Sequence, residues 1–367
     1  MEKLEKQALL ALTYVPGLGI KTLQELMANF DSAQEIWNLS LKDKNSITGM
    51  SQEMANEIGS KKIWDLAKNE IDFCESRGIQ VISMDEAAYP NLLAQCSDAP
   101  FVVFFRGNNV DLNRGKFVSI VGTRKMTTRG KEFVHELVAG FKNQPITIVS
   151  GLALGVDAEA HKAAMENDIA TIGVLAHGVN QIFPRTNENI GRKMMENGGL
   201  FSEFSSFHAP EPENFLRRNR IIAGLCDATI VIESGIAGGA MSTASHANNY
   251  NRDVFALAGR VSDQSAAGCH HLIKNHKAFL LTEAADVLKY LNITPKKKQN
   301  IVQKELFIQL SEPEQLLYDM LKKNGKLHID KIALEMSLPT YQLMPILLDL
   351  ELKNLISPLS GKYYELN

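Results

Sequence analysis

The residues best suited to chemistry in this chain are arginines that follow short apolar runs and glycines. Residues 117–121 are β-branched and aromatic, which predicts a strand buried on both faces, and Gly122-Thr123-Arg124 follows directly. A glycine turn between a strand and a helix brings backbone N–H groups to the surface, where the helix dipole also favours a phosphate. Arg124 adds a planar, permanently charged fork suited to phosphate oxygens. The stretch predicts an anion site, although an ordinary parallel-sheet turn with an exposed arginine would have the same pattern.

A second basic group lies at the start of a predicted amphipathic helix. Phe215 is followed by Arg217, Arg218 and Arg220, so three guanidinium groups lie within four residues. They cannot all face a core, and at least two should point at solvent or an anion. Phe215 could stack on a base, as in proteins that bind single strands, or pack as the buried staple of its helix. Further basic residues could join these arginines around one crevice: Arg124, Lys125, Arg129 and Arg185.

Two other groups of residues suggest catalysis. Ser150, Asp157 and His161 are the residue types of a hydrolase triad, but the serine lies outside a Gly-x-Ser-x-Gly turn. Asp157 fits better at the start of a helix, where His161 four residues later can pair with it. Glu233 precedes a glycine-rich loop, where a carboxylate could serve a ribosyl hydroxyl, act as a base or orient the loop. We assign no catalytic residue to these patterns.

Composition restricts the class of protein. A length of 367 residues is enough for two or three domains, and a net charge of −3 means that any nucleic-acid site must be local. Residues 1–6 lack a signal-peptide core and no apolar run is long enough to cross a bilayer, so we expect a cytoplasmic protein without a membrane span. The cysteines form no CxxC pair, and Cys269, His270, His271 and His276 lack accompanying ligands; we expect no metal and no other cofactor.

The elements that position these residues can be predicted from the alternation of apolar runs and helical patterns. The runs are 117–121, 146–149, 170–175, 200–203, 228–232, 254–257 and 278–281. Such alternation predicts a doubly wound, mostly parallel α/β sheet. Thr127 or Thr128 is suited to cap the helix over about 128–141. Because ligands bind outside the carboxyl ends of such strands, the glycine and hydroxyl turns should line one shared crevice.

Both ends of the chain show other patterns. Residues 15–22 form a glycine-containing turn between amphipathic segments 3–14 and 21–30, the layout of a helix-hairpin-helix. The N–H groups of such a turn can face a phosphate, although a plain helical turn has the same sequence. Three helical patterns and a two-stranded finish in residues 311–367 predict a winged helix. This region has six Lys, no Arg and eight Asp and Glu, and a net charge near −2 favours protein contact over DNA.

The expected domains follow from these patterns. Residues 1–110 would form a helical domain with the helix-hairpin-helix-like turn, and residues 111–293 the domain with the doubly wound sheet. Residues 294–310, charged and marked by Pro295, would be a linker before the winged-helix-like domain at 311–367.

Taken in order, the motifs resemble those of the DNA-processing protein DprA (Smf) family. They are Gly122-Thr123-Arg124, Ser150 to Asp157, Ser202-Glu203, Phe215 with Arg218-Asn219-Arg220, Ser242-Thr243-Ala244, and Gly268 with Leu272-Ile273. The resemblance is strongest over residues 80–290 and looser at both ends. The sequence departs from the family pattern in three loops, at Gly178 to Pro184, at Gly238 to Ala244 and at Ala258-Gly259. None of these departures removes a basic residue.

The resemblance implies an extended Rossmann-like DNA-binding domain at residues 111–293, after an N-terminal domain of the helix-hairpin-helix or SAM-like type. It also implies a single-stranded DNA-binding protein of natural transformation, or competence. Such proteins protect incoming DNA and assist the loading of RecA-type recombinase, usually as homodimers and without catalysing a reaction. By matching positions, the phosphate pocket would comprise Gly122, Thr123, Arg124, Ser150, Gly151, Arg218, Asn219 and Arg220. Arg185 and Phe215 match a basic and an aromatic position beside it, and Arg217 completes the expected DNA-binding residues.

Two other functions compete with this one. A nucleotide hydrolase similar to phosphoribohydrolases would need Glu233 or Asp157 beside a monophosphate pocket. Those enzymes have a proline before Gly238-Gly239 and a glutamate at the position of Ala244, and this sequence has neither. A regulator that reads DNA with its winged helix is disfavoured by the acidic charge of that region.

Overall fold

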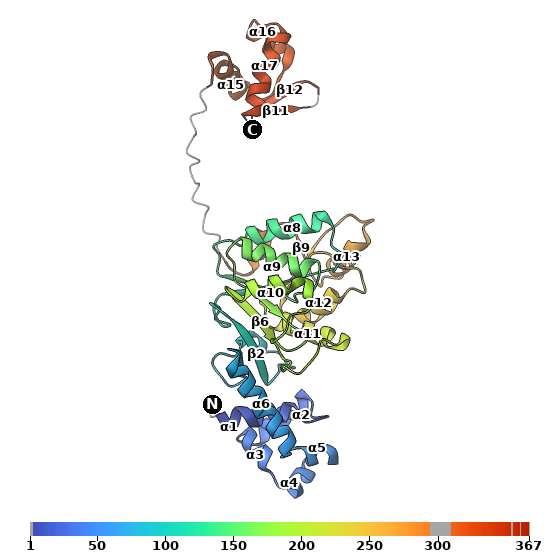
Figure 1. The fold of residues 1–367 in the computed structure, drawn as a ribbon. Coiled ribbons are helices and arrows are strands. Elements are labelled where there is room, and N and C mark those ends of the chain that lie inside the picture. The colour runs from blue at the N-terminus through green and yellow to red at the C-terminus, as the bar shows by residue number, and fades with distance from the viewer. Residues whose placement is uncertain (1–2, 294–309, 354, 360, 367) are drawn as a thin grey trace. The chain divides into compact units, whose positions relative to one another are not determined.

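The computed structural model describes residues 3–293, 310–353, 355–359 and 361–366, and in it the chain forms two compact units (Figure 1). The first unit is Met1–Pro295 and the second is Lys296–Asn367. The predicted linker lies, apart from Leu310, outside the described residues. Within the described ranges, no helix has both the length and the apolar character needed to cross a membrane.

The first unit is built on a nine-stranded sheet with the order β1-β2-β6-β5-β4-β3-β7-β8-β9. The strands are β1 (Gln80–Ser83), β2 (Val102–Asn108), β3 (Lys116–Val121), β4 (Ile146–Ser150), β5 (Thr171–Val174), β6 (Gly198–Ser202), β7 (Ala228–Val231), β8 (Asp253–Leu257) and β9 (Phe279–Leu281). All pairings from β6 to β9 are parallel, whereas β2 pairs antiparallel with β6 and β1 with β2. The predicted doubly wound α/β fold and its seven strands are confirmed.

Helices cover both faces of this sheet, which explains why its strands are apolar throughout. Along β3, Phe117 and Val121 pack into one core, and Val118 and Ile120 pack into the other. The first core lies under α11 (Pro212–Gly224), α12 (Gly239–Asn249) and α13 (Ala267–Lys274). The second lies under α8 (Thr128–Ala139), α9 (Val156–Glu166) and α14 (Ala284–Tyr290). A further helix, α10 (Glu188–Met194), contacts β5 and β6.

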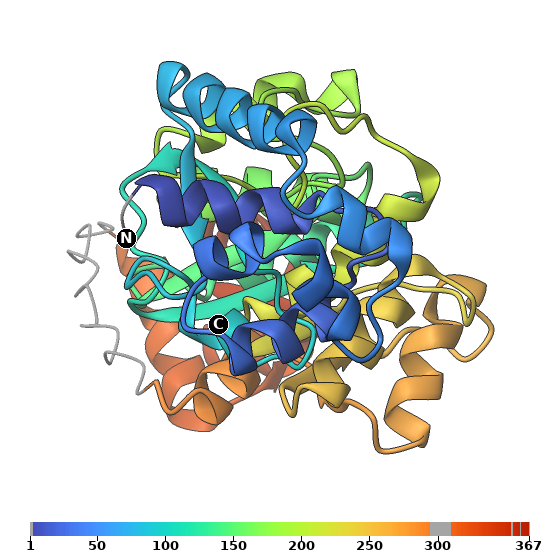
Figure 2. The same ribbon diagram turned by 90° about the horizontal axis from the view of Figure 1, so that it is seen from below.

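Helices at the start of the chain lie against the antiparallel end of the sheet, as the blue ribbons in Figures 1 and 2 show. They are α1 (Lys3–Thr13), α2 (Ile20–Asn29), α3 (Ala33–Asn38), α4 (Leu41–Ser46), α5 (Gln52–Glu57) and α6 (Lys61–Ser76), with the short α7 (Asn91–Ala94) further along. The two helices predicted on either side of the glycine-containing turn are confirmed as α1 and α2, and Gly17 in that turn has a left-handed φ of 80°. Leu9 and Leu12 share a core with Phe104 of β2.

The predicted boundary at residue 110 falls after both antiparallel strands. β1 and β2 precede it in the chain, yet they belong to the same sheet as β6. Glu70 of α6 also reaches the main domain, because its carboxylate accepts hydrogen bonds from the Ser206 N–H (2.7 Å) and the Ser206 hydroxyl (2.5 Å). The placing of a domain boundary at this residue stays a prediction.

The second unit is a winged helix, as predicted. Its elements are α15 (Glu312–Asn324), β10 (Leu327–His328), α16 (Ile329–Glu335), α17 (Thr340–Leu352), β11 (Ile356–Leu359) and β12 (Tyr363–Leu366), with the sheet order β10-β12-β11. Leu317, Ile332 and Leu347 lie in a core of their own. A reciprocal capping box between Ser311 and Glu314 begins α15.

Candidate nucleic-acid interface

A cavity of about 260 Å³ lies at the carboxyl ends of β3 and β7, which we call the strand-end crevice. Chain connections run from β3 toward β4 and from β7 toward β8, so the strand order reverses here and a ligand site is expected. The crevice is lined by predicted residues Gly122, Thr123, Arg124, Phe215, Arg218 and Asn219, together with Gly238 and Gly239 before and at the start of α12. A neighbouring cavity of about 440 Å³ shares Arg124 and Phe215 and includes Gly151.

Gly122 is needed for close approach between three elements. A Cβ on it would lie 2.5 Å from Cγ2 of Val156 and 2.9 Å from the carbonyl oxygen of Glu233. The prediction that this turn presents its N–H groups to a ligand is wrong for Thr123, because the Thr123 N–H donates to the Glu233 carbonyl (2.7 Å). The turn therefore fixes the end of β3 against α9 and β7, and the side chain of Arg124 provides its positive charge.

Glu233 orients the loop that carries Arg124, whereas the sequence had suggested a role in the glycine-rich loop that follows Glu233 itself. Its carboxylate accepts hydrogen bonds from the N–H (2.9 Å) and the hydroxyl (2.5 Å) of Thr127. The same threonine caps α8 by accepting from the Gly130 N–H (3.0 Å), as the sequence predicted for Thr127 or Thr128. A Cβ on Gly130 would lie 2.8 Å from the carboxyl carbon of Glu233, so a glycine leaves room for the carboxylate.

Arg218 is buried and forms the framework of the crevice. Its Nη1 donates to the carbonyls of Gly151 (2.7 Å) and Val174. Burial lowers the pKa of Arg218 to about 10, although Asp157 opposes this shift. Burial raises the pKa of Asp157 against the opposing charge of Arg218. A Cβ on Gly151 would lie 2.6 Å from Nη2 of Arg218 and 2.6 Å from Oδ2 of Asp157, so this glycine makes room for the pair.

Arg124 is the cation that the crevice presents to solvent. It is exposed and has no hydrogen bond or ion pair within the described residues, and its guanidinium lies 5.9 Å from the ring centroid of Phe215. The guanidinium of Arg218 lies 6.0 Å from the same ring. Two positive groups beside one ring repel each other, so a bound anion would stabilise both. Nearby in sequence, Lys125 and Arg129 are also exposed and without an ion pair in the described part of the chain.

The remaining predicted site residues differ in exposure and in their ion pairs. Arg185 is exposed just before α10, and Ser150 is buried at the end of β4. Arg220 is buried in an ion pair with Glu203 and donates to the carbonyl of Asp98 (2.5 Å). Arg217 is half-exposed, with its Nη2 3.1 Å from Glu203. Of the three arginines on α11, only Arg217 is exposed, whereas Arg218 and Arg220 are buried. The shared partner of Arg217 and Arg220, Glu203, was not assigned from the sequence.

The predicted catalytic alternatives lack their geometry. The Ser150 hydroxyl donates to the carbonyl of Ile120 (2.6 Å), and Nδ1 of His161 lies 2.7 Å from the hydroxyl of Thr171. The suggested pairing of His161 with Asp157 is therefore wrong, and burial lowers the pKa of His161 to about 3. Among the described residues, no three His, Cys, Asp or Glu side chains gather where they could hold a metal.

These features define a doubly wound α/β protein with an arginine-lined crevice at the strand-order reversal, followed by a winged-helix unit. The family model described as DNA recombination-mediator protein A matches residues 80–292. A second model, the DprA winged helix domain, matches residues 308–362. The chain belongs to the DprA (Smf) family of DNA-processing proteins.

Relatives and solved structures agree with this assignment. The DNA processing protein DprA of Streptococcus pneumoniae is 37% identical over 206 residues, covering 56% of this chain and 72% of the relative. The protein Smf of Escherichia coli is 30% identical over 303 residues, covering 82% and 80%. The X-ray structure of the S. pneumoniae protein superimposes with a TM-score of 0.62 at 30% identity, over 77% of this chain and 95% of that one.

A second solved structure bears on the site. DNA processing protein A from Helicobacter pylori superimposes with a TM-score of 0.53 at 26% identity, over 58% of this chain and 95% of that one. That structure is described as showing a unique single-stranded DNA binding mode of the H. pylori protein.

Proposed function

We propose that this protein binds single-stranded DNA through its phosphate backbone at the strand-end crevice. The observation that carries the proposal is Arg124, exposed and without an ion pair in the described residues, above the half-buried ring of Phe215 at the end of β3. An unpaired guanidinium suits a phosphate oxygen, and the adjacent ring suits a base. Single-stranded DNA binding by the H. pylori relative supports the same class of ligand.

The start of α12 adds to the attraction for a phosphate. This helix of eleven residues begins after Gly238 without a side-chain cap, and Gly238, Gly239 and Ala240 line the crevice. The first N–H groups of an uncapped helix lack partners within the helix, and its dipole favours negative charge. The buried Arg218 and Asp157 hold the loops of the crevice in place, while the exposed Arg124 contacts the single-stranded DNA. Contacts of this kind hold the backbone and read little sequence.

The proposal extends to the wider role implied by the family: protection of incoming single strands and assistance in loading RecA-type recombinase during natural transformation, in the cytoplasm and without catalytic turnover. A homodimer belongs to the same proposal. One support is the edge strand β9, where Phe279, Leu280 and nearby Tyr290 are each exposed by two-fifths or more. An exposed apolar edge suits another protein surface. Light scattering of wild type and Leu280→Glu tests the dimer, which the variant should weaken if this edge is the contact.

The binding proposal is tested by fluorescence anisotropy of a labelled single strand across a salt series. Backbone binding predicts a slope of about −0.7 in log affinity against log salt for each phosphate contacted. Arg124→Ala should bind more weakly, with a slope shallower by about 0.7. Arg114→Ala is the matched control, since this exposed arginine precedes β3 and lies at the opposite end of the strand. No wild-type binding at low salt, or equal binding by Arg124→Ala, would overturn the proposal.

A further inference from the structure

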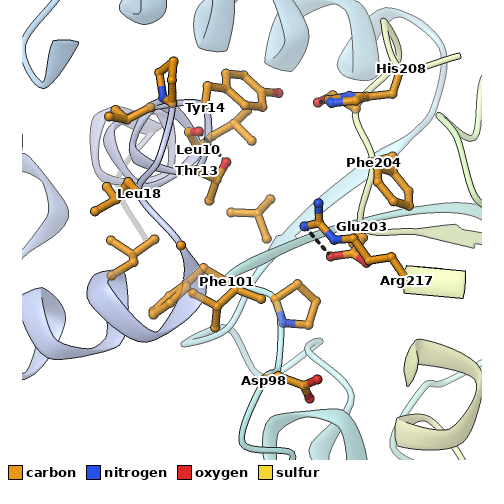
Figure 3. Close-up of a pocket in the computed structure, with 18 of the residues that line it drawn as sticks. Leu10, Thr13, Tyr14, Leu18, Asp98, Phe101, Glu203, Phe204, His208 and Arg217 are labelled. Atoms are coloured by element: carbon orange, nitrogen blue, oxygen red, sulfur yellow. Dashed lines mark hydrogen bonds and ion pairs between the residues drawn. The ribbon is translucent and has the colours of Figure 1, made fainter. Parts of the chain in front are cut away.

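A second cavity, of about 850 Å³, lies between the α1–α2 turn and the segment that follows β6 (Figure 3). Thr13 ends α1, Tyr14 and Leu18 belong to the α1–α2 turn, and Glu203, Phe204 and His208 come from the segment after β6. Arg217 of α11 lines it as well, and we call it the hairpin pocket. The strand-end crevice is lined by other residues.

One wall of the hairpin pocket holds an unsatisfied carboxylate oxygen. The side chain of Glu203 is only 3% exposed, and its Oε2 pairs with both Arg217 and Arg220. Its Oε1 is buried, and no group in the described part of the chain donates a hydrogen bond to it. A buried acceptor without a donor is costly, so a ligand N–H at this wall would stabilise the site.

Aromatic surface lies in the same pocket. Phe207 is 50% exposed, although its ring stacks on His208 with centroids 4.6 Å apart. Tyr14 packs against Phe207 edge-on at 5.3 Å. An exposed ring supported by two others is rigid, and a rigid ring is a suitable platform for a flat base.

Positive charge lies at the pocket's rim. Lys21 is exposed and has no ion pair within the described residues, and Arg217 keeps about half of its side chain in solvent. Both residues line the pocket, together with Gly19, which precedes α2 without a side-chain cap. α2 has ten residues, so its first N–H groups and its dipole add to the attraction for an anion. The pocket thus combines an acceptor for N–H groups, a stacking surface and an anion site, which together match a nucleotide.

Helix α11 connects the two sites. Phe215 and Arg218 line the strand-end crevice, whereas Arg217 and Arg220 line the hairpin pocket. Successive residues of an α-helix are rotated by about 100° about the helix axis, so the two sites lie on different sides of α11 within about one turn. A single strand bound at the crevice can therefore cross α11 and reach the pocket.

We propose that the hairpin pocket is a second nucleotide site for the same single strand. A base stacks on Phe207 and donates an N–H to Oε1 of Glu203, while its phosphate meets Lys21 and Arg217. This inference rests on the proposed function, since the strand must also occupy the crevice. It makes the N-terminal helices part of the DNA-binding surface.

The test compares a short strand of about five nucleotides, enough for one site, with one of about twenty. Phe207→Ala should weaken binding of the long strand roughly tenfold and leave the short strand unchanged, because loss of one stacked base acts only where the pocket is reached. Lys21→Ala should make the salt slope for the long strand shallower by about 0.7. Lys68→Ala, which removes an exposed lysine of α6 outside the pocket, is the matched control.

The outcomes separate this inference from the proposed function. If wild type fails to bind either strand, the proposed function fails. If wild type binds both and the Phe207 and Lys21 variants equal wild type on the long strand, the second site is wrong and the crevice stands. Equal weakening of both strands would also contradict a separate site. If circular dichroism shows that Phe207→Ala is unfolded, Lys21→Ala decides whether the second site exists. Ultraviolet cross-linking of the long strand to the peptide containing Phe207 gives an independent positive result.

Discussion

The strand-end crevice and the winged-helix unit both belong to folds that often bind nucleic acids, but they place their charges differently. The crevice presents Arg124, and Lys125 and Arg129 follow it closely in sequence; all three are exposed and without ion pairs among the described residues, in a chain with a net charge of −3. In the winged helix, Lys353 is paired with Glu314 (2.5 Å) and Lys331 lies 4.0 Å from Glu335. The other four lysines of that unit, Lys322, Lys323, Lys326 and Lys362, are exposed and without an ion pair among the described residues. The two regions therefore differ in local charge balance, since the winged helix has no arginine and a net charge near −2, and this distinguishes them better than fold class does.

The third helix of the winged-helix unit strengthens the contrast. In winged helices and related motifs that read DNA, this helix enters the major groove with polar and basic side chains. Here α17 exposes apolar ones instead: Tyr341 (74%), Leu348 (54%) and Leu352 (76%). A contiguous exposed apolar stripe is typical of a protein-contact surface. The comparison therefore favours DNA contact at the crevice and protein contact at the winged helix.

The largest effect should follow loss of the buried cation beneath the crevice. Arg218→Ala leaves the Asp157 carboxylate buried without its opposite charge and frees the carbonyls of Gly151 and Val174. Removing one partner of a buried pair costs about 3–5 kcal/mol of unfolding free energy. Urea unfolding followed by the fluorescence of Trp37 and Trp64 reports on the first unit, where both tryptophans lie.

The control for Arg218→Ala is a substitution at the preceding residue of α11, Arg217. Arg217→Ala removes a half-exposed side chain whose pairing with Glu203 is shared with Arg220, so it should cost less than about 1 kcal/mol. Equal stability losses for the two variants would show that Arg218 is not the framework of the crevice.

The contrast between the arginines of α11 shows which features of the site could be predicted from the sequence. Apolar alternation predicted the strands, and the Gly122–Arg124 turn was placed correctly because local patterns encode both. Three arginines within four residues look alike in sequence. Their different environments depend on Glu203, Asp157 and the carbonyl of Val174, which lie outside α11 and are brought near it only by the fold. The hairpin pocket likewise needs segments almost 200 residues apart, Tyr14 and Phe207 among them.

The next largest effect concerns the stability of the winged helix and its dependence on pH. Hydrogen bonds from Lys353 and from Ser311 lower the pKa of Glu314 from 4.5 to about 2. A lowered folded-state pKa contributes stability that is present above pH 4.5 and is lost as the pH falls toward 2. Glu314→Gln should therefore destabilise α15 by about 1 kcal/mol at neutral pH, and the difference from wild type should shrink in acid.

Amide hydrogen exchange of α15 peptides in the full-length protein measures this effect. Wild type and Glu314→Gln are compared at each pH, so that the intrinsic exchange rates cancel. Affinity for single-stranded DNA at neutral pH should stay unchanged, because the contact lies in the unit that we assign to protein binding. A pH-independent difference, or a loss of DNA affinity, would contradict the division of roles between the two regions.

A smaller effect should separate charge from shape at the crevice. Arg124→Lys keeps the positive charge and loses the planar fork and its position beside the Phe215 ring. The salt slope should equal that of wild type, while affinity falls by about 0.5–1 kcal/mol, the usual strength of an exposed cation–π contact. Anisotropy across the salt series measures both quantities. A slope as shallow as that of Arg124→Ala would show that the lysine no longer reaches the phosphate.

The smallest effect should come from the largest change, removal of residues 311–367. The region has a net charge near −2 and its described lysines are partly paired, so its loss releases few counterions from DNA. The truncation stops at residue 310 so that Lys296, Lys297 and Lys298 remain and the charge of the predicted linker is unchanged. Affinity should stay within about twofold of wild type with the same salt slope. A tenfold loss with a shallower slope would place phosphate contacts on the winged helix and remove the contrast between the two regions.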